Sequence, residues 1–103
     1  MMNKYLEKKI KVISSENLTK KPNIFSLEYY LVESNVLENE QKYYEKAFGI
    51  EIVKKENNKH IESEIVKNLS FEKNEVISIL KKLAKNTVTP ISMLFVLDNL
   101  IGV

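Results

Sequence analysis

The stretch Lys85-Asn86-Thr87-Val88-Thr89-Pro90, called the elbow below, separates two apolar segments near the C-terminus and decides how the chain folds. Before it, apolar residues from Val76 to Ala84 recur at the spacing of one helix face, which predicts a helix over about residues 72–85. Asn86 tolerates the left-handed backbone that commonly ends a helix. Thr89-Pro90 combines a capping hydroxyl with the fixed φ of a first helical residue, so a second helix is predicted over about residues 90–101.

The residues before the helices alternate between apolar and polar side chains, which is typical of half-buried strands. Polar connections divide this region into strands predicted over about residues 5–13, 24–32, 42–55 and 60–69. Asn57-Asn58 predicts a tight hairpin, because Asn accepts positive φ. Gly49, which lies inside a predicted strand, indicates a bulge or a close approach of two backbones.

Strict alternation also assigns the side chains that face the core. These are Leu6, Ile10 and Val12 in the first strand, Phe25, Leu27, Tyr29 and Leu31 in the second, Tyr44, Phe48, Ile50 and Ile52 in the third, and Ile61, Ser63 and Ile65 in the fourth. Short connections favour antiparallel neighbours. We therefore expect one α+β domain over residues 1–103, a four-stranded antiparallel meander sheet followed by a C-terminal helical hairpin packed on one face.

The composition limits the classes of function. The 103 residues carry a net charge of +2, and all 16 basic residues are lysine, so the guanidinium group that reads guanine edges is missing. The chain has no cysteine, which excludes disulfides and thiolate metal sites. The N-terminus lacks the apolar core of a signal peptide, and the longest apolar run, Met93 to Leu97, is too short to cross a bilayer. We expect a cytoplasmic protein with no membrane contact.

The sequence shows no pattern typical of a catalytic site. His60, Glu62 and Glu64 alternate, so on a regular strand they would share one face and form a ligand set that zinc accepts. The same pattern is ordinary for a solvated sheet face. Nucleophile motifs and phosphate-binding glycine loops are absent from the sequence. We therefore expect a protein that is no enzyme and uses neither a cofactor nor a metal.

The elbow itself is a candidate ligand site. Lys85, Asn86, Thr87 and Thr89 precede a predicted helix N-terminus, whose free N–H groups and dipole attract anions. Their amide, hydroxyl and ammonium groups suit a phosphate or a carboxylate. The alternative is that Asn86 and Thr89 only cap the two helices.

The last predicted helix is apolar almost all round. Ile91, Leu94, Leu97 and Ile101 form one stripe, while Met93, Phe95, Val96 and Leu100 spread apolar surface around the rest. Such a helix is either buried within its own molecule or covered in part by a second subunit or another protein. The second reading predicts an interface at Met93, Phe95, Val96 and Leu100.

Two tyrosines, Tyr30 and Tyr43, are predicted to lie on the wet face of the sheet. Together with Lys9, Lys11 and Lys55 they could stack and hold the bases of an RNA strand. Glutamates interleaved with these residues weaken the positive field that such binding needs. Nucleic acid is therefore disfavoured as a partner, and weak RNA binding is a further alternative.

Two motifs, Phe48-Gly49-Ile50-Glu51-Ile52 and the segment from Leu83 to the end of the elbow, carry a resemblance to a known family. Over about residues 44–101 the chain resembles a small family of roughly hundred-residue proteins of unknown function from Gram-positive anaerobic bacteria. The resemblance implies a complete small protein without an assigned activity.

Taken together, these features predict a non-enzymatic protein-interaction or regulatory module, with a homodimer as one form of the interaction. A small-ligand or anion-binding protein that uses residues 86–89 is the alternative.

Overall fold

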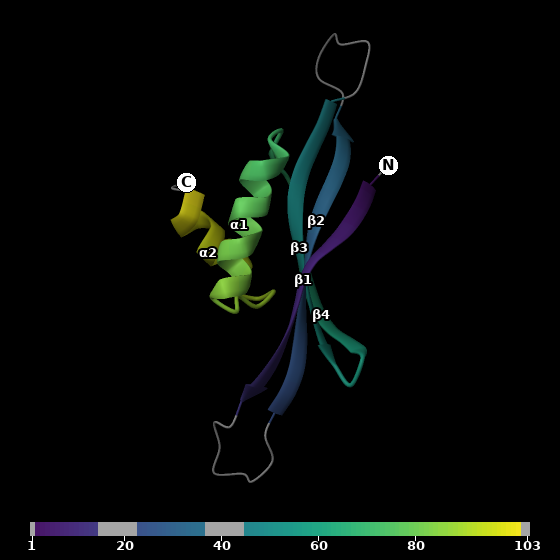
Figure 1. Cartoon of the computed structure of the whole chain (residues 1–103), viewed down its shortest axis with the longest axis vertical. Coiled ribbons are helices and arrows are strands. Elements are labelled where there is room, and N and C mark those ends of the chain that lie inside the picture. Colours follow the sequence, from purple (N-terminus) through teal and green to yellow (C-terminus); the bar gives the residue numbers. More distant parts are fainter. Residues whose placement is uncertain (1, 15–22, 37–44, 102–103) are drawn as a thin grey trace.

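The chain folds as a twisted antiparallel sheet with two helices on one side (Figure 1). The computed structural model describes residues 2–14, 23–36 and 45–101. The elements are β1 (Met2–Ser14), β2 (Asn23–Val36), β3 (Glu45–Glu56), β4 (Lys59–Ser70), α1 (Lys73–Lys85) and α2 (Met93–Ile101), and the strand order is β1-β2-β3-β4. The predicted α+β fold, a four-stranded meander followed by two C-terminal helices, is confirmed. Residues 42–44 of the predicted third strand lie outside the described residues.

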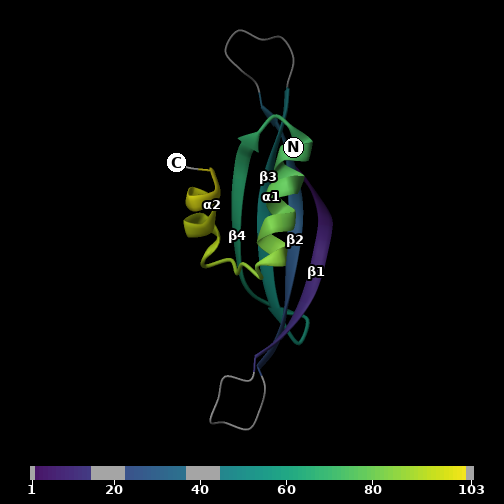
Figure 2. The same ribbon diagram turned by 60° about the vertical axis from the view of Figure 1, so that its left-hand side comes forward.

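The core lies between the sheet and the helices. α1 lies over β2 and β3, and α2 lies beside α1, toward the β4 edge (Figure 2). The buried side chains of this cluster are Leu27, Tyr29 and Leu31 of β2, Phe48, Ile50 and Ile52 of β3, Val76, Leu80 and Leu83 of α1, Val88 of the elbow, and Met93 and Leu97 of α2. The predicted inner faces of the second and third strands are thus confirmed for every described residue. We call this side of the sheet the helical face and the opposite side the open face.

In β1 the alternation is interrupted by a bulge. Leu6 pairs with Tyr30 and Lys8 pairs with Tyr29, so Glu7 is an extra residue. Directly paired residues share a face, which places Leu6 with Tyr30 on the open face. The prediction that Leu6 faces the core was wrong, because one inserted residue reverses every assignment on one side of it.

β4 contains a similar irregularity, between its pairs with Lys54 and Lys55. Ser63 therefore lies opposite Val53 on the open face, and Ile65 also lies on that face, opposite Glu51. The predicted inner face of this strand was wrong. The residues of β4 that pack against the core are Val66 and Leu69.

Gly49 lies at a close approach of the backbones of β3 and β4, at an irregular pairing between Phe48 and Ile50. A Cβ added at Gly49 would lie 2.1 Å from the carbonyl oxygen of Val66 and 2.8 Å from the Cα of Lys67. Both neighbours are backbone atoms, which cannot rotate away. The predicted close backbone approach at Gly49 is confirmed, and only glycine fits there.

The hairpin between β3 and β4 turns at two residues with positive φ. Asn57 has a φ of 53° and Asn58 a φ of 62°. Positive φ at both central residues is the geometry of the tight turn that suits the twist of a hairpin. The hairpin predicted at Asn57-Asn58 is confirmed.

We expect Gly49→Ala to destabilise the protein by about 2–4 kcal/mol, because the added methyl group forces the backbones of β3 and β4 apart. Urea unfolding followed by circular dichroism measures the change. Lys46→Ala, at an exposed position of the same strand, should stay within about 0.5 kcal/mol of the wild type. Equal stability of Gly49→Ala and the wild type would contradict the close approach.

Candidate functional site

The elbow is attached to the centre of the sheet by a buried hydrogen bond. The hydroxyl of Tyr29 donates to the carbonyl oxygen of Val88 at 2.8 Å, across 59 residues of sequence. Tyr29 is fully buried, and burial raises the pKa of its hydroxyl to about 12. The hydroxyl therefore stays protonated and remains a donor over the physiological pH range. This bond fixes where α1 ends and where α2 can begin.

The end of α1 is a Schellman motif. The N–H of Val88 donates to the carbonyl of Leu83 at 3.0 Å, and the N–H of Thr87 donates to that of Ala84 at 3.1 Å. Thr87 has a φ of 53°, whereas Asn86 has a φ of −94°. The prediction of a left-handed Asn86 was wrong by one residue. Thr87 takes that conformation although it is β-branched, because the buried Val88 must follow directly.

The start of α2 lies later than predicted. The N–H of Ser92 donates to the carbonyl of Thr89 at 3.2 Å, and the N–H of Met93 donates to that of Pro90 at 3.3 Å. These bonds span three residues and form a turn, so α2 begins at Met93 and the predicted start at residue 90 was wrong. Within this turn the hydroxyl of Ser92 lies 2.9 Å from that of Thr89 and accepts the N–H of Thr89 at 3.3 Å.

The four predicted ligand-binding residues do not converge on one point. The Asn86 amide donates to the carbonyl of Lys82 at 2.8 Å, so this side chain caps α1 as the capping alternative expected. The Thr89 hydroxyl is bonded to Ser92, and Lys85 lines a groove beside α1. The position of Thr87 is explained by the helix end alone. Anion binding at these residues stays a prediction without geometric support.

Removing the Tyr29 hydroxyl tests its attachment to the elbow. We expect Tyr29→Phe to lose about 1–2 kcal/mol of unfolding free energy, because the buried carbonyl of Val88 is left without a donor. Tyr5→Phe removes a hydroxyl from an exposed tyrosine of β1 and should change the stability little. Equal effects of the two variants in chemical unfolding would contradict this role of Tyr29.

The inward face of α2 consists of Met93, Val96 and Leu97, which pack into the core. Of the apolar stripe seen in the sequence, Leu97 packs into the core, whereas Ile91 and Leu94 are exposed. The exposed apolar side chains are Ile91 of the preceding turn, 80% exposed, and Leu94, 51%, Phe95, 72%, and Leu100, 43%, of α2. We call Ile91, Leu94 and Phe95 the outer α2 surface.

The predicted interface residues separate into two groups. Phe95 and Leu100 are exposed, and Val96 is half-buried. Met93 is fully buried in the core, so it supports the position of α2 and offers no surface to a partner. The apolar surface available for contact therefore includes Phe95 and Leu100, which the sequence prediction named, and Ile91 and Leu94, which it did not.

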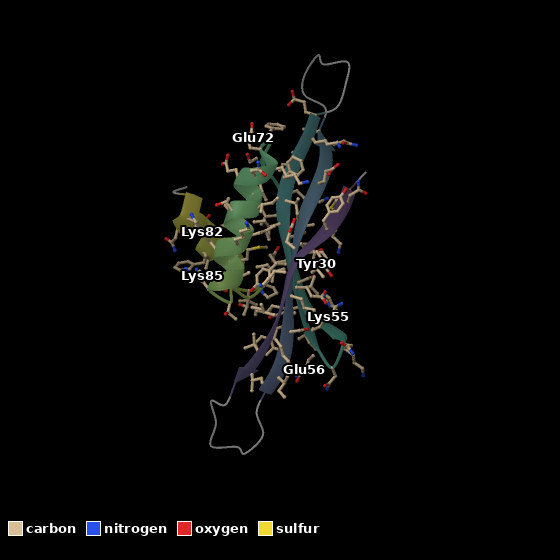
Figure 3. The ribbon with its side chains drawn as sticks, viewed as in Figure 1. Tyr30, Lys55, Glu56, Glu72, Lys82 and Lys85 are labelled. Atoms are coloured by element: carbon tan, nitrogen blue, oxygen red, sulfur yellow. The ribbon has the colours of Figure 1, made fainter. Side chains whose placement is uncertain are left out.

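The open face carries a network of charged side chains around Glu28, which is only 5% exposed. The Tyr30 hydroxyl donates to Glu28 Oε1 at 2.6 Å, and the ammonium groups of Lys55 and Lys9 lie 3.1 and 3.8 Å from its carboxylate. The three strands β1, β2 and β3 each supply part of this network (Figure 3). Sequence reasoning placed Glu28 on the wet face but missed its burial, because long lysine side chains cover it.

The pKa values of Glu28 and Tyr30 move in opposite directions. Burial alone would raise the pKa of Glu28, but the Tyr30 hydrogen bond and the charges of Lys55 and Lys9 outweigh it and hold the pKa below its ordinary value. The same hydrogen bond, together with burial and the charges of Glu28 and Glu51, raises the pKa of Tyr30 to about 12. Glu28 is therefore a fixed anion at neutral pH, with a full set of partners.

The three residues predicted as possible metal ligands do not lie on the same face of the sheet. His60 lies opposite Lys55 on the open face, whereas Glu62 and Glu64 lie opposite Lys54 and Ile52 on the helical face. The prediction of a shared face was wrong because the irregularity falls between His60 and Glu62. His60 instead bonds Ser63 at 3.1 Å beside a hollow of about 210 Å³. No group of three potential ligand side chains suited to a metal ion occurs in residues 2–14, 23–36 and 45–101.

The tyrosine surface proposed for RNA is engaged within the molecule. The ammonium group of Lys4 lies 4.9 Å from the centre of the Tyr30 ring and also bonds Glu51 at 2.6 Å. Lys9 and Lys55 are paired with Glu28, as described above, and Tyr43 lies outside the described residues. Lys4, Lys9 and Lys55 are thus paired with glutamates, whereas Lys11 takes part in none of the ion pairs of the described residues. RNA binding stays a prediction.

Replacing the carboxylate of Glu28 by an amide should make the free energy of unfolding depend less on pH in the acid range. Between the lowered folded-state pKa and the ordinary value of 4.5, the unfolded state binds more protons, so stability falls as the pH falls through the folded-state pKa. Glu28→Gln keeps an acceptor for Tyr30 but removes the charge. We expect it to be less stable than the wild type at neutral pH, with a difference that closes in acid. Urea unfolding at a series of pH values measures this, and a constant difference would contradict it.

The comparison with known protein families gives one match. The model of a family of unknown function, DUF6514, matches residues 8–103. The chain belongs to this family. The match includes both motifs that carried the resemblance, and the residues of the elbow and of α2 lie within it. The comparisons with curated proteins and with solved structures find no significant match.

The described helices are short. None of them has both the length and the apolar character needed to cross a membrane.

Proposed function

We propose that the protein is a non-enzymatic protein-interaction or regulatory module that forms a homodimer through the outer α2 surface. The observation that supports this most directly is the exposure of Ile91, Leu94 and Phe95. Three large apolar side chains within five residues of sequence are exposed, and together they present more apolar surface to water than a single exposed residue does. Covering them would remove that surface from water.

A second copy of the chain suits this surface. Ile91, Leu94 and Phe95 carry no charge, and Asp98 is the only charged residue of α2. An uncharged apolar surface is complementary to itself across a two-fold axis, since no charge has to meet its opposite. The remainder of α2 packs into the core through Met93 and Leu97, so the surface is presented on a fixed support.

The absence of enzymatic activity belongs to the same proposal. The ionisable groups that gather on the open face are bonded to one another, and Glu28 is held as an anion instead of being poised to exchange a proton. A chain without cysteine also suits a reducing cytoplasm, which is the location we propose. An origin in Gram-positive anaerobic bacteria stays a prediction from the resemblance.

Sedimentation equilibrium over micromolar to millimolar concentrations tests the homodimer. We expect the wild type to shift from monomer toward dimer, and Phe95→Glu to raise the dissociation constant at least about tenfold, because a charge enters the centre of an apolar contact.

Phe71→Glu is the matched control. Phe71 is 50% exposed, lies between β4 and α1, and is outside the outer α2 surface. Phe71→Glu should dimerise as the wild type does. Circular dichroism should show that Phe71→Glu and Phe95→Glu are both folded. A wild type that stays monomeric at millimolar concentration, or equal weakening by both variants, would overturn the proposed dimer.

A further inference from the structure

A groove of about 460 Å³ lies between α1 and the edge strand β1, on the side of α1 away from α2. Its apolar lining is formed by Ile77, Leu80 and Ala84 of α1. Its charged lining consists of Glu7 and Lys8 of β1 and Lys81 and Lys85 of α1. The groove exists because α1 lies over β2 and β3 and covers the helical face of β1 only in part (Figure 2).

The strand beside the groove has an unpaired edge. In the described part of the chain β1 pairs with β2 alone, so the backbone groups along its other side have no strand partner. The 13-residue strand also exposes Tyr5 on one face and Leu6 and Ile13 on the other. An added strand would satisfy the backbone groups, and its inward side chains would lie against α1 in the groove.

The charged residues of the groove lining indicate which kind of added strand can bind there. Lys8, Lys81 and Lys85 take part in none of the ion pairs found among the described residues, and they outnumber the one carboxylate of the lining, Glu7. A second copy of β1 in this place would bring the lysines of two identical edges together, which is unfavourable. A segment with carboxylates at alternate positions meets the opposite charge instead.

We propose that the β1 edge binds an acidic, extended segment of a partner protein as a fifth strand. Successive side chains of a strand point to opposite faces, so the carboxylates of that segment enter the groove and face Lys8, Lys81 and Lys85. Its apolar side chains then lie on the open face, beside the exposed Leu6 and Ile13 of β1. This inference goes beyond the proposed homodimer and is independent of it, because the outer α2 surface and the β1 edge share no residue.

Three synthetic peptides of about eight residues test the inference. One alternates Glu and Val, the second alternates Lys and Val, and the third is the Glu/Val peptide with alternate backbone nitrogens methylated. Binding is measured by fluorescence anisotropy, and the site is located from amide chemical shifts of the labelled full chain. We expect the Glu/Val peptide to bind and to shift the amides of β1, with the other two at least about tenfold weaker.

Two double variants separate the groove from general charge attraction. Lys81→Gln with Lys85→Gln should weaken the Glu/Val peptide roughly tenfold. Lys73→Gln with Lys82→Gln removes the same charge from the same helix outside the groove lining and should leave the affinity within about twofold of the wild type. Neutral glutamine suits an exposed helix position, so both variants should keep the circular dichroism spectrum of the wild type.

Several results would overturn the inference. These are no binding of the Glu/Val peptide, equal binding of the acidic and basic peptides, an affinity that survives methylation, and equal weakening by the two double variants. Concentration-dependent shifts of the β1 amides without any peptide would make a second copy the occupant, which also overturns it. None of these results bears on dimerisation through α2, which the effect of Phe95→Glu reports.

Discussion

The position of both helices depends on the buried hydrogen bond from Tyr29 to the carbonyl of Val88. The donor lies in β2, at the centre of the helical face, and the acceptor lies in the elbow. A buried carbonyl without a donor is costly, so the elbow is stable where this hydroxyl is available. With Val88 buried in the core, the Schellman motif ends α1, which lies over β2 and β3. The turn that includes Ser92 then leads into α2, which lies toward the β4 edge.

Much of this architecture could be predicted from the sequence. The alternation in β2 and β3, the helical spacing before the elbow, Asn57-Asn58 and Gly49 are local signals, and each local signal agreed with the final fold. The errors in the faces of β1 and β4 came from irregular strand pairings, which leave no mark in the pattern of apolar and polar residues. The extra residue Glu7 in β1 and the irregular pairing before Glu62 reversed the faces of their strands, and alternation alone cannot reveal them.

The candidate sites were predicted less well, for the same physical reason. Which side of α2 faces water depends on where the helix begins, and a turn over Thr89 to Met93 precedes it, where the sequence predicted a start at Pro90. The burial of Glu28 depends on lysines that reach it from two neighbouring strands, and thus on strand register. The apolar character of α2 was visible in the sequence, but the identity of its outward residues was not.

The order of the strands has a consequence for the way the molecule forms. Each strand pairs with its neighbour in the sequence, so hairpins can assemble one after another with little loop-closure entropy. The hydrogen bond between Tyr29 and Val88 joins residues 59 positions apart, so it can form only after the elbow has been synthesised. On the ribosome, a nascent sheet would thus wait with its apolar side open until the final third of the chain emerges, and this interval is when the polypeptide is most exposed to aggregation.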